Sequence, residues 1–133
     1  MAVANGTFDV KLTPQAPDDR PECAMLGTMS IEKQFHGDLE ATSAGRMLTA
    51  GTDVKGSAGY VAIERISGKL HGRAGSFVLQ HSGTLARGVP QQSITVVPDS
   101  GTGELVVLAG TMVIIIADGK HSYKLEYTLP EGA

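Results

Sequence analysis

Two strand-length runs decide the fold of this chain: Tyr60-Val61-Ala62-Ile63-Glu64-Arg65-Ile66 and Ser76-Phe77-Val78-Leu79-Gln80-His81-Ser82. Both are rich in apolar residues, and glycines stand between them at Gly68, Gly72 and Gly75. Successive side chains of a strand point to opposite faces of a sheet, so each polar residue in these runs must face one side or the other. The pattern favours two neighbouring antiparallel strands joined by a tight turn.

Runs of the same kind fill most of the remaining chain, without a helical pattern between them. They cover residues 7–13, 25–36, 39–48, 93–97, 105–116 and 122–129. Pairs such as Gly37-Asp38 and Asp118-Gly119 lie between the runs and supply the positive backbone dihedrals that tight hairpins need. Glycines within the runs suit a curved sheet. We therefore expect an all-β fold, a single antiparallel eight-stranded β-barrel with little or no helix.

One domain accounts for the whole chain. A chain of 133 residues can bury roughly two-thirds of its surface, which is enough for an independent core. The main polar break is the segment from Pro14 to Glu22, which contains three prolines. It could be a simple connection or an ordered lid over one end of the barrel. We therefore expect residues 1–133 to form a single β-barrel domain.

The run that ends in Val113-Ile114-Ile115-Ile116 carries more apolar residues than one interior face can absorb. Such a strand is expected to be covered on both faces, and exposed apolar area of this kind usually marks an interface. The segment from Val106 to Ile116 therefore predicts a homo-oligomer, either a dimer or a trimer.

Composition and charge argue against several classes of partner. The formal net charge is −3 and the sequence has no Trp, three Phe and three Tyr, so neither a basic footprint nor a stacking platform for nucleic acid is expected. The sequence contains no apolar run of membrane-spanning length and does not begin with the pattern of a signal peptide. We expect no membrane partner and a cytoplasmic location. Cys23 stands alone, which excludes an internal disulfide and fits a reducing compartment.

The histidines do not predict a metal centre. His36, His71, His81 and His121 are dispersed over different runs, and no two of them are separated by a single residue. A metal site on a β-barrel usually uses two histidines on alternate positions of one strand, because these point to the same side. We expect neither a metal nor another cofactor.

Glu64 is the polar residue that stands out, because it lies in the middle of an apolar run. By parity Glu64 shares a face with Tyr60 and Ala62, and Arg65 faces the opposite side. If the first face lines the barrel, burial should raise the pKa of Glu64 above its ordinary value of about 4.3, which would make it a candidate general base. If the second face is interior, Arg65 would hold an anion. A surface ion pair of Glu64 is the third alternative.

Gln80 and His81 form a second polar interruption in mid-strand, and they must point to opposite faces. One of them is expected to enter the barrel. There it could orient a ligand carbonyl or share a hydrogen bond with Glu64, although a structural hydrogen bond to a neighbouring strand is an equal alternative.

Long blocks of this sequence resemble the bacterial domain of unknown function 3224. The blocks are Lys33–Leu39, Gly56–Glu64, Gly75–Thr84 and Val97–Leu105. This resemblance implies an eight-stranded antiparallel barrel similar in fold to allene oxide cyclase, and it implies no settled activity. The cyclase's own motif does not match residue by residue, so the resemblance assigns no catalytic residue.

Three functions remain open at this point. The first is a barrel that binds a small apolar or amphipathic molecule through Tyr60, Glu64 and either Gln80 or His81. The second is a cofactor-independent isomerase, cyclase or lyase in which Glu64 is the base and His81 or Tyr60 polarises an oxygen. The third is a filled barrel that acts only as a structural or assembly module.

Overall fold

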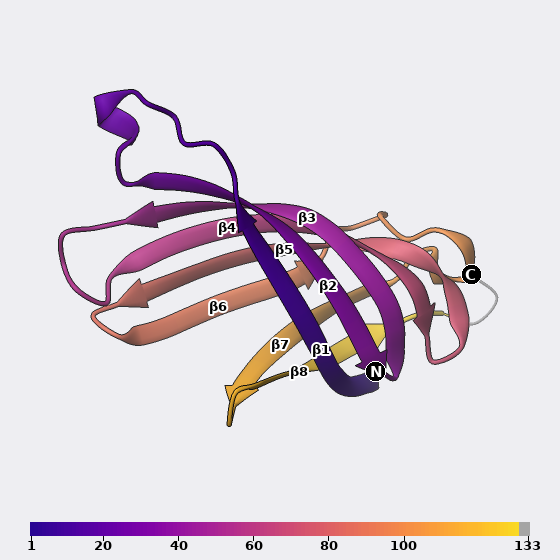
Figure 1. The fold of residues 1–133 in the computed structure, drawn as a ribbon. Helices are drawn as coiled ribbons and strands as arrows, with labels where there is room; N and C mark the ends of the chain where they lie inside the picture. Colours follow the sequence, from indigo (N-terminus) through magenta and orange to yellow (C-terminus); the bar gives the residue numbers. More distant parts are fainter. Residues whose placement is uncertain (131–133) are drawn as a thin grey trace.

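The chain forms a closed antiparallel barrel of eight strands, as the sequence predicted (Figure 1). The computed structural model describes residues 1–130. Its strands are β1 (Ala2–Pro14), β2 (Leu26–Gly37), β3 (Leu39–Gly51), β4 (Ala58–Leu70), β5 (Arg73–Ala86), β6 (Val89–Val96), β7 (Ala109–Ala117) and β8 (Lys120–Thr128). Two short 3-10 turns, η1 (Pro21–Cys23) and η2 (Gly103–Leu105), complete the fold.

The ladder between strands is continuous except at one seam. Each strand pairs with its neighbour in sequence, and β8 returns to β1 with Ala4 opposite Leu125. Between β6 and β7, however, the only paired position is Thr95 opposite Thr111. Figure 1 shows the β7–β8 hairpin turning away from β6 as it approaches its tip. The barrel is therefore sealed at one end and split at the other.

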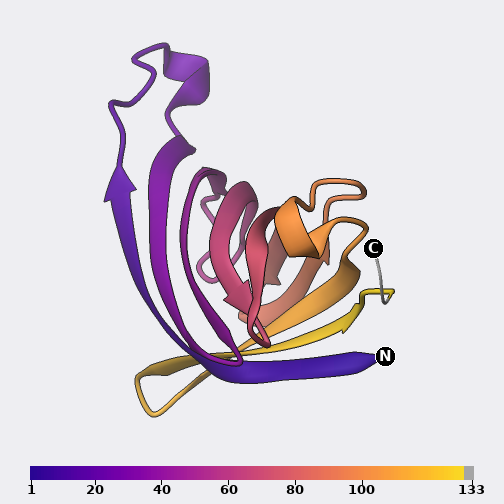
Figure 2. The ribbon, with the colours of Figure 1, turned by 90° about the vertical axis from the view of Figure 1, so that its right-hand side faces the viewer.

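The closed end holds the hydrophobic core. This end carries the β2–β3 and β4–β5 turns and the connection from β6 through η2 to β7 (Figure 2). Large side chains fill it completely: Phe35, Leu39, Leu70, Phe77, Leu105, Tyr123 and Leu125 are all buried. Tyr123 also ties two strands together, because its hydroxyl accepts a hydrogen bond from the Leu39 amide and donates one to the His36 carbonyl, each at 2.9 Å.

The opposite end, which we call the open end, leaves part of the inner wall accessible. It carries the β1–β2 connection and the β3–β4, β5–β6 and β7–β8 turns. Leu12 shares the inward parity of Phe8, and Ile116 shares that of Met112, yet 45% and 67% of their surfaces are exposed. Leu85 on β5 is exposed in the same way. Because these apolar side chains face inward and still reach solvent, the inner surface is open at this end.

The segment between β1 and β2, residues 15–25, projects from the barrel as an arm that contains η1 (Figures 1 and 2). Pro17, Arg20 and Cys23 of the arm line a cavity together with outward-facing residues of the sheet, such as Leu48 and Val61. The arm therefore borders the outer face of the barrel and does not cover its open end as a lid would.

The expectation that the strand around Val113 is covered on both faces is wrong within this chain. The strand proper begins only at Ala109, and Leu105 and Leu108 before it are buried in the core. Val113 and Ile115 point outward and are about half exposed. The side of β7 that carries Val113 and Ile115 is therefore left uncovered by the described chain. No helix among residues 1–130 is long and apolar enough to cross a membrane.

Replacing Tyr123 by Phe should destabilise the protein by about 1–3 kcal/mol, because it leaves the Leu39 amide and the His36 carbonyl without their buried partner. Urea unfolding monitored by circular dichroism would measure the change. Tyr60→Phe is the matched control, since the Tyr60 hydroxyl bonds only to the exposed side chain of Gln92. Equal effects of the two substitutions would contradict the role of Tyr123.

Candidate functional site

Glu64 lies inside the barrel, on the face that parity shares with Tyr60 and Ala62. Its side chain is completely buried, and Ala62 beside it is also buried. Arg65 faces outward and donates a hydrogen bond to the Ser76 hydroxyl at 3.0 Å. Arg65 therefore cannot hold an anion inside the barrel.

Three side chains from three other strands converge on the Glu64 carboxylate. Lys33 on β2 donates to Oε1 at 2.9 Å, and His81 on β5 contacts the same oxygen through Nε2 at 2.7 Å. Ser43 on β3 donates to Oε2 at 2.7 Å. All three partners are buried. We call Lys33, Ser43, Glu64 and His81 the buried quartet.

The electrostatics of the buried quartet correct the expected pKa of Glu64. Burial by itself would raise the pKa of this carboxyl. The hydrogen bond from His81, the charge and hydrogen bond of Lys33 and the hydrogen bond from Ser43 outweigh burial and lower the pKa to about 2. The sequence-based expectation of a raised pKa was therefore wrong. A carboxylate with so low a pKa is a poor proton acceptor near neutral pH.

His81 is the member of the quartet with a ring nitrogen left over. When Nε2 donates its proton to Glu64, Nδ1 carries a lone pair. No buried side-chain nitrogen or oxygen of the described residues lacks a hydrogen-bond partner, and no described group bonds to Nδ1. Nδ1 therefore retains some exposure. A carboxylate paired with an imidazole in this way fixes the tautomer and the orientation of the ring.

Aromatic rings connect Lys33 to the open end. The Lys33 ammonium lies 4.9 Å from the centre of the Phe8 ring and 5.7 Å from that of Phe35. On the neighbouring strand β8, the His121 ring lies 5.3 Å from the Phe8 ring. Phe8, Val10 and His121 line a hollow of about 470 Å³. The quartet is thus linked through packed rings to a hollow at the open end.

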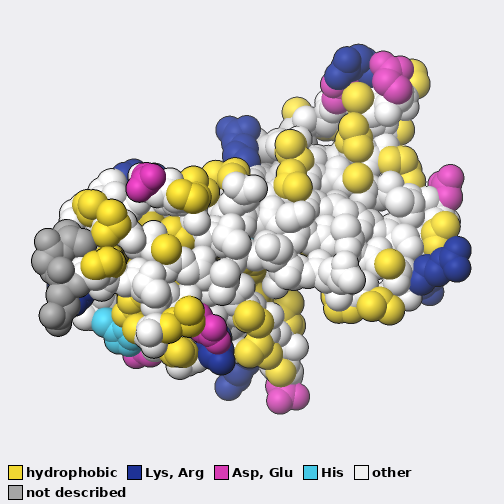
Figure 3. Space-filling model, turned by 180° about the vertical axis from the view of Figure 1, so that it is seen from behind, with side chains coloured by type: hydrophobic (Ala, Val, Ile, Leu, Met, Phe, Trp, Pro, Cys, Tyr) yellow, Lys and Arg dark blue, Asp and Glu magenta, His cyan; other side chains and the backbone are white. Residues whose placement is uncertain are grey.

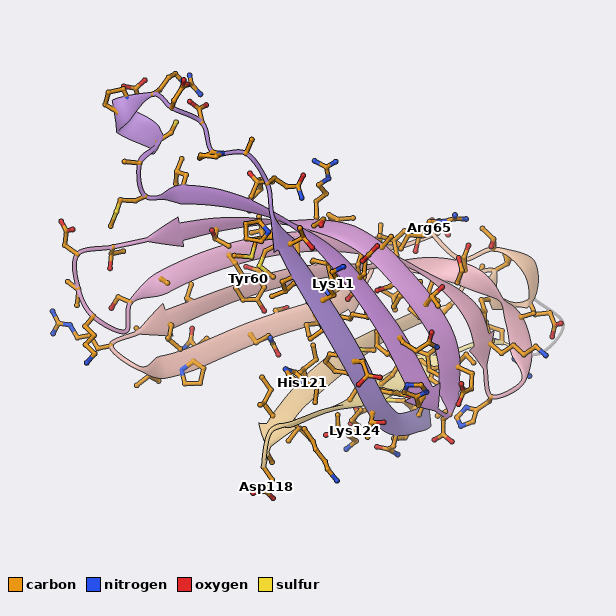
Figure 4. All side chains as sticks on the ribbon, in the orientation of Figure 1. Lys11, Tyr60, Arg65, Asp118, His121 and Lys124 are labelled. Atoms are coloured by element: carbon orange, nitrogen blue, oxygen red, sulfur yellow. The ribbon has the colours of Figure 1, made fainter. Side chains whose placement is uncertain are left out.

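Tyr60 and small residues occupy the wall on the other side of the quartet. The Tyr60 ring covers Gly83, where an added Cβ would come within 2.3 Å of the ring. Its hydroxyl accepts a hydrogen bond from Gln92 at 2.8 Å. Gly83 and Gln92 also line a hollow of about 530 Å³ between β5 and β6, together with the outward-facing Ser82, Thr84, Gln91 and Ser93. Figure 4 labels Tyr60 on β4 and His121 on β8, so these two rings belong to different walls of the barrel.

The structure separates the predicted site residues into two groups. Glu64 and His81 are in contact, and Tyr60 faces inward further toward the open end. Gln80, in contrast, is exposed on the outer face and lines a hollow with Arg46. Gln80 therefore cannot contact a molecule held beside Glu64. His81 is the one of this pair that enters the barrel.

Sequence reasoning missed Lys33 and Ser43. Lys33 has the same parity as Ile31 and Phe35, both of which are buried. A lysine on the apolar face of a strand was therefore the available signal for a buried cation. Ser43 follows Leu39 and Ala41 on the inner face of β3, but a small polar residue carries no comparable signal.

The residues suited to metal binding do not come together. Among residues 1–130, no three His, Cys, Asp or Glu side chains are grouped as ligands of an ion. Cys23 lies alone in η1 on the arm, partly exposed. Within the described chain the chemistry of the site therefore rests on the buried quartet.

Comparisons with known proteins agree with the fold. The family described as "Protein of unknown function (DUF3224)" matches residues 4–127. A crystal structure of a protein with unknown function from the DUF3224 family of Shewanella oneidensis MR-1 is 49% identical, with a TM-score of 0.92. The alignment covers 99% of this chain and 99% of that chain. No curated protein matches the chain.

The buried quartet makes stability depend on pH in the acid range. The folded-state pKa of Glu64, about 2, lies below the ordinary value of 4.5, so the stabilisation is complete above pH 4.5 and is lost as the pH falls toward 2. The loss should be on the order of 3 kcal/mol. Urea unfolding between neutral pH and pH 2 would measure it.

The matched variant for this measurement is Lys33→Met/Glu64→Gln, which removes both charges while roughly keeping the side-chain volumes. Its stability should fall less steeply in the same pH range. Glu32→Gln, which changes an exposed carboxylate on the same strand as Lys33, should keep the wild-type slope. Identical slopes for wild type and the double variant would contradict the low pKa of Glu64.

Proposed function

Because the chain belongs to the DUF3224 family, which is described only as of unknown function, we propose a function from its site: it binds a small amphipathic molecule in the open end of the barrel. One observation carries this proposal. A fully buried ion pair with two further hydrogen-bonding side chains lies within a barrel whose inner wall is accessible at one end.

The cost of the buried quartet supports a functional role. Removing a lysine and a glutamate from water costs several kcal/mol per charge, and well-packed apolar residues of similar size often stabilise a core as well or better. The closed end of this barrel has such an apolar core. Charged groups at this depth therefore fit recognition of a ligand better than stability alone.

The open end supplies the apolar part of the proposed site. Leu12, Leu85 and Ile116 face inward and are exposed, so they can contact an apolar body that enters from this side. Pockets with mostly apolar walls and a few polar groups are typical of small-molecule sites, and barrel mouths are a common place for them.

The polar groups indicate which ligand chemistry fits. Lys33 uses one of its three N–H groups on Glu64 and can donate another to a ligand oxygen. His81 Nδ1 can accept a proton or a hydrogen bond, and the Tyr60 hydroxyl, which accepts from Gln92, can still donate. An apolar molecule with an oxygen-bearing end, such as a hydroxyl, carbonyl or carboxylate group, matches this set.

The proposal can be tested with anilinonaphthalene sulfonate, a fluorescent amphipathic anion. Its fluorescence should rise on titration with the protein, and the dissociation constant should increase about tenfold or more in Lys33→Met/Glu64→Gln, since the polar partners are lost. Val113→Ser, which removes an exposed apolar group from the outer face of β7, should leave the constant unchanged. An unchanged constant in Lys33→Met/Glu64→Gln, or weaker binding only in Val113→Ser, would contradict the proposal.

The contact between Glu64 and His81 also favours a second candidate, a cofactor-independent proton-transfer enzyme. The roles differ from the sequence-based hypothesis. With the pKa of Glu64 at about 2, His81 Nδ1 is the group suited to accept a proton, and Glu64 positions the ring. In such a step His81 Nδ1 would take the α-proton of a bound ketone. The C–H electron pair would form the new C=C bond, and the carbonyl π pair would move to the oxygen to give an enolate. Lys33 would stabilise that oxygen by a hydrogen bond.

This second candidate can be tested without knowing the substrate. A long-chain methyl ketone incubated with the protein in D₂O should exchange its α-hydrogens faster than in buffer, as measured by proton NMR. His81→Gln should reduce the excess rate by roughly 100-fold, the usual scale for a general base. Val113→Ser, on the outer face of β7, is the control and should keep the excess rate. An excess rate that survives in His81→Gln would exclude His81 as the base.

A further inference from the structure

The outer face of β2 to β5 forms an apolar groove beside the arm. A cavity of about 610 Å³ is lined by the arm residues Pro17, Arg20 and Cys23 and by Leu48 and Val61 of the sheet. An adjoining hollow of about 620 Å³ shares Leu48 and Val61 and extends along the strands to Ile63 and Arg46. We call this continuous surface the outer groove.

The floor of the outer groove is unusually apolar for a solvent-facing sheet. Leu48, Val61 and Ile63 lie on adjacent strands with 56%, 50% and 49% of their surfaces exposed. Leu26 at the root of the arm is exposed as well. An antiparallel sheet normally places polar side chains on its solvated face, and a contiguous apolar patch usually marks an interaction surface.

Charge is distributed unevenly along the outer groove. At one end the arm carries Asp18, Asp19 and Glu22, of which only Asp18 is paired, with Arg20 at 2.6 Å. At the other end Arg46 and Arg65 point outward on β3 and β4. Neither arginine has a carboxylate of residues 1–130 within ion-pair distance. The acidic arm and the basic end therefore flank the apolar floor on opposite sides.

Figure 3 shows the arm from behind, with acidic and basic side chains together at its tip and hydrophobic side chains nearer the barrel. The arm therefore has charged side chains at its tip and apolar side chains next to the barrel. The outer groove likewise has a charged residue at its far end and apolar residues on its floor. A projecting element of this kind can reach over a neighbouring molecule.

We propose that the outer groove is covered by a second copy of this chain, and that the acidic arm of each copy lies over Arg46 of the other. The two-fold axis lies between the two stacked sheets, near Leu48 and Val61, and is perpendicular to the strands. Rotation about this axis reverses the strand direction. It brings the arm end of one copy over the Arg46 end of its partner. Apolar floors then meet in the centre, and unlike charges meet at both ends.

Self-complementarity is the reason to favour a second copy over another occupant. The groove is open, and the arm at one end carries the acidic residues Asp19 and Glu22, whereas Arg46 lines the other end. A small apolar ligand would leave those charges unused. The interface also differs from the one expected from the sequence, which placed it on the strand around Val113.

The charged contact between copies can be tested by mixing two variants. Arg46→Glu alone should place a second negative charge opposite Asp19, and Asp19→Lys alone should place a second positive charge opposite Arg46. Each variant should raise the dimer dissociation constant about tenfold or more. An equimolar mixture should recover the wild-type constant. In each heterodimer the two substituted side chains, again opposite in charge, meet at one end, and the unsubstituted Arg46 and Asp19 meet at the other. Mass measurement by light scattering over a dilution series gives all constants.

Two apolar substitutions locate the interface on the barrel. Val61→Asp in the centre of the outer groove should give a monomer, whereas Val113→Asp, at an equally exposed position on β7, should remain a dimer. Circular dichroism confirms that each variant is folded. A monomeric wild type, a dimer lost only in Val113→Asp, or no recovery in the mixture of charge variants would each overturn the proposal.

Discussion

The buried contact between Lys33 and Glu64 is the interaction on which the rest of the inner wall depends. The two side chains come from β2 and β4, which are not neighbours in the sheet, so their 2.9 Å contact spans β3. Ser43 on the intervening strand and His81 on the next one complete the carboxylate's hydrogen bonds. Four consecutive strands are thereby held at one level of the barrel. The quartet also separates the dense apolar core of the closed end from the accessible inner surface beyond it.

The barrel is sealed at one end and open at the other. This difference explains how one small domain can have both an accessible inner surface and a regular outer surface. Because β6 and β7 pair only at Thr95 and Thr111, the β7–β8 hairpin can diverge, and the interior does not have to be filled along its whole length. Apolar side chains such as Ile116, which would be buried in a fully sealed barrel, face an opening instead. On the outside, β2 to β5 form a regular, fully paired sheet, and this regularity makes a continuous surface that another sheet can cover.

The period of two predicted the strands and placed Glu64 on the same face as Tyr60 and Ala62, because alternation is a local property of each strand. The same rule explains why one of Gln80 and His81 had to enter the barrel, although it could not say which. The sign of the Glu64 pKa shift could not be predicted in this way. It depends on Lys33 and His81, which lie 31 and 17 residues away in sequence, and only the register of three strands brings them to one carboxylate. The exposure of Val113 was missed because a run of four apolar residues hides the period of two, although Val113 shares the outward parity of Ile115.

The pairing of β1 with β8 has a consequence for the way the chain folds. The β1–β2 to β5–β6 and β7–β8 pairings join strands that follow one another directly, so these hairpins can form from local contacts. The contact between Ala4 and Leu125, in contrast, joins residues from opposite ends of the chain. Bringing them together has the largest loop-closure entropy, and native contacts of such long sequence separation slow folding. We therefore expect an open, curved sheet to assemble first and the β1–β8 joint to form last, with the core of the closed end becoming fully packed only at that final step.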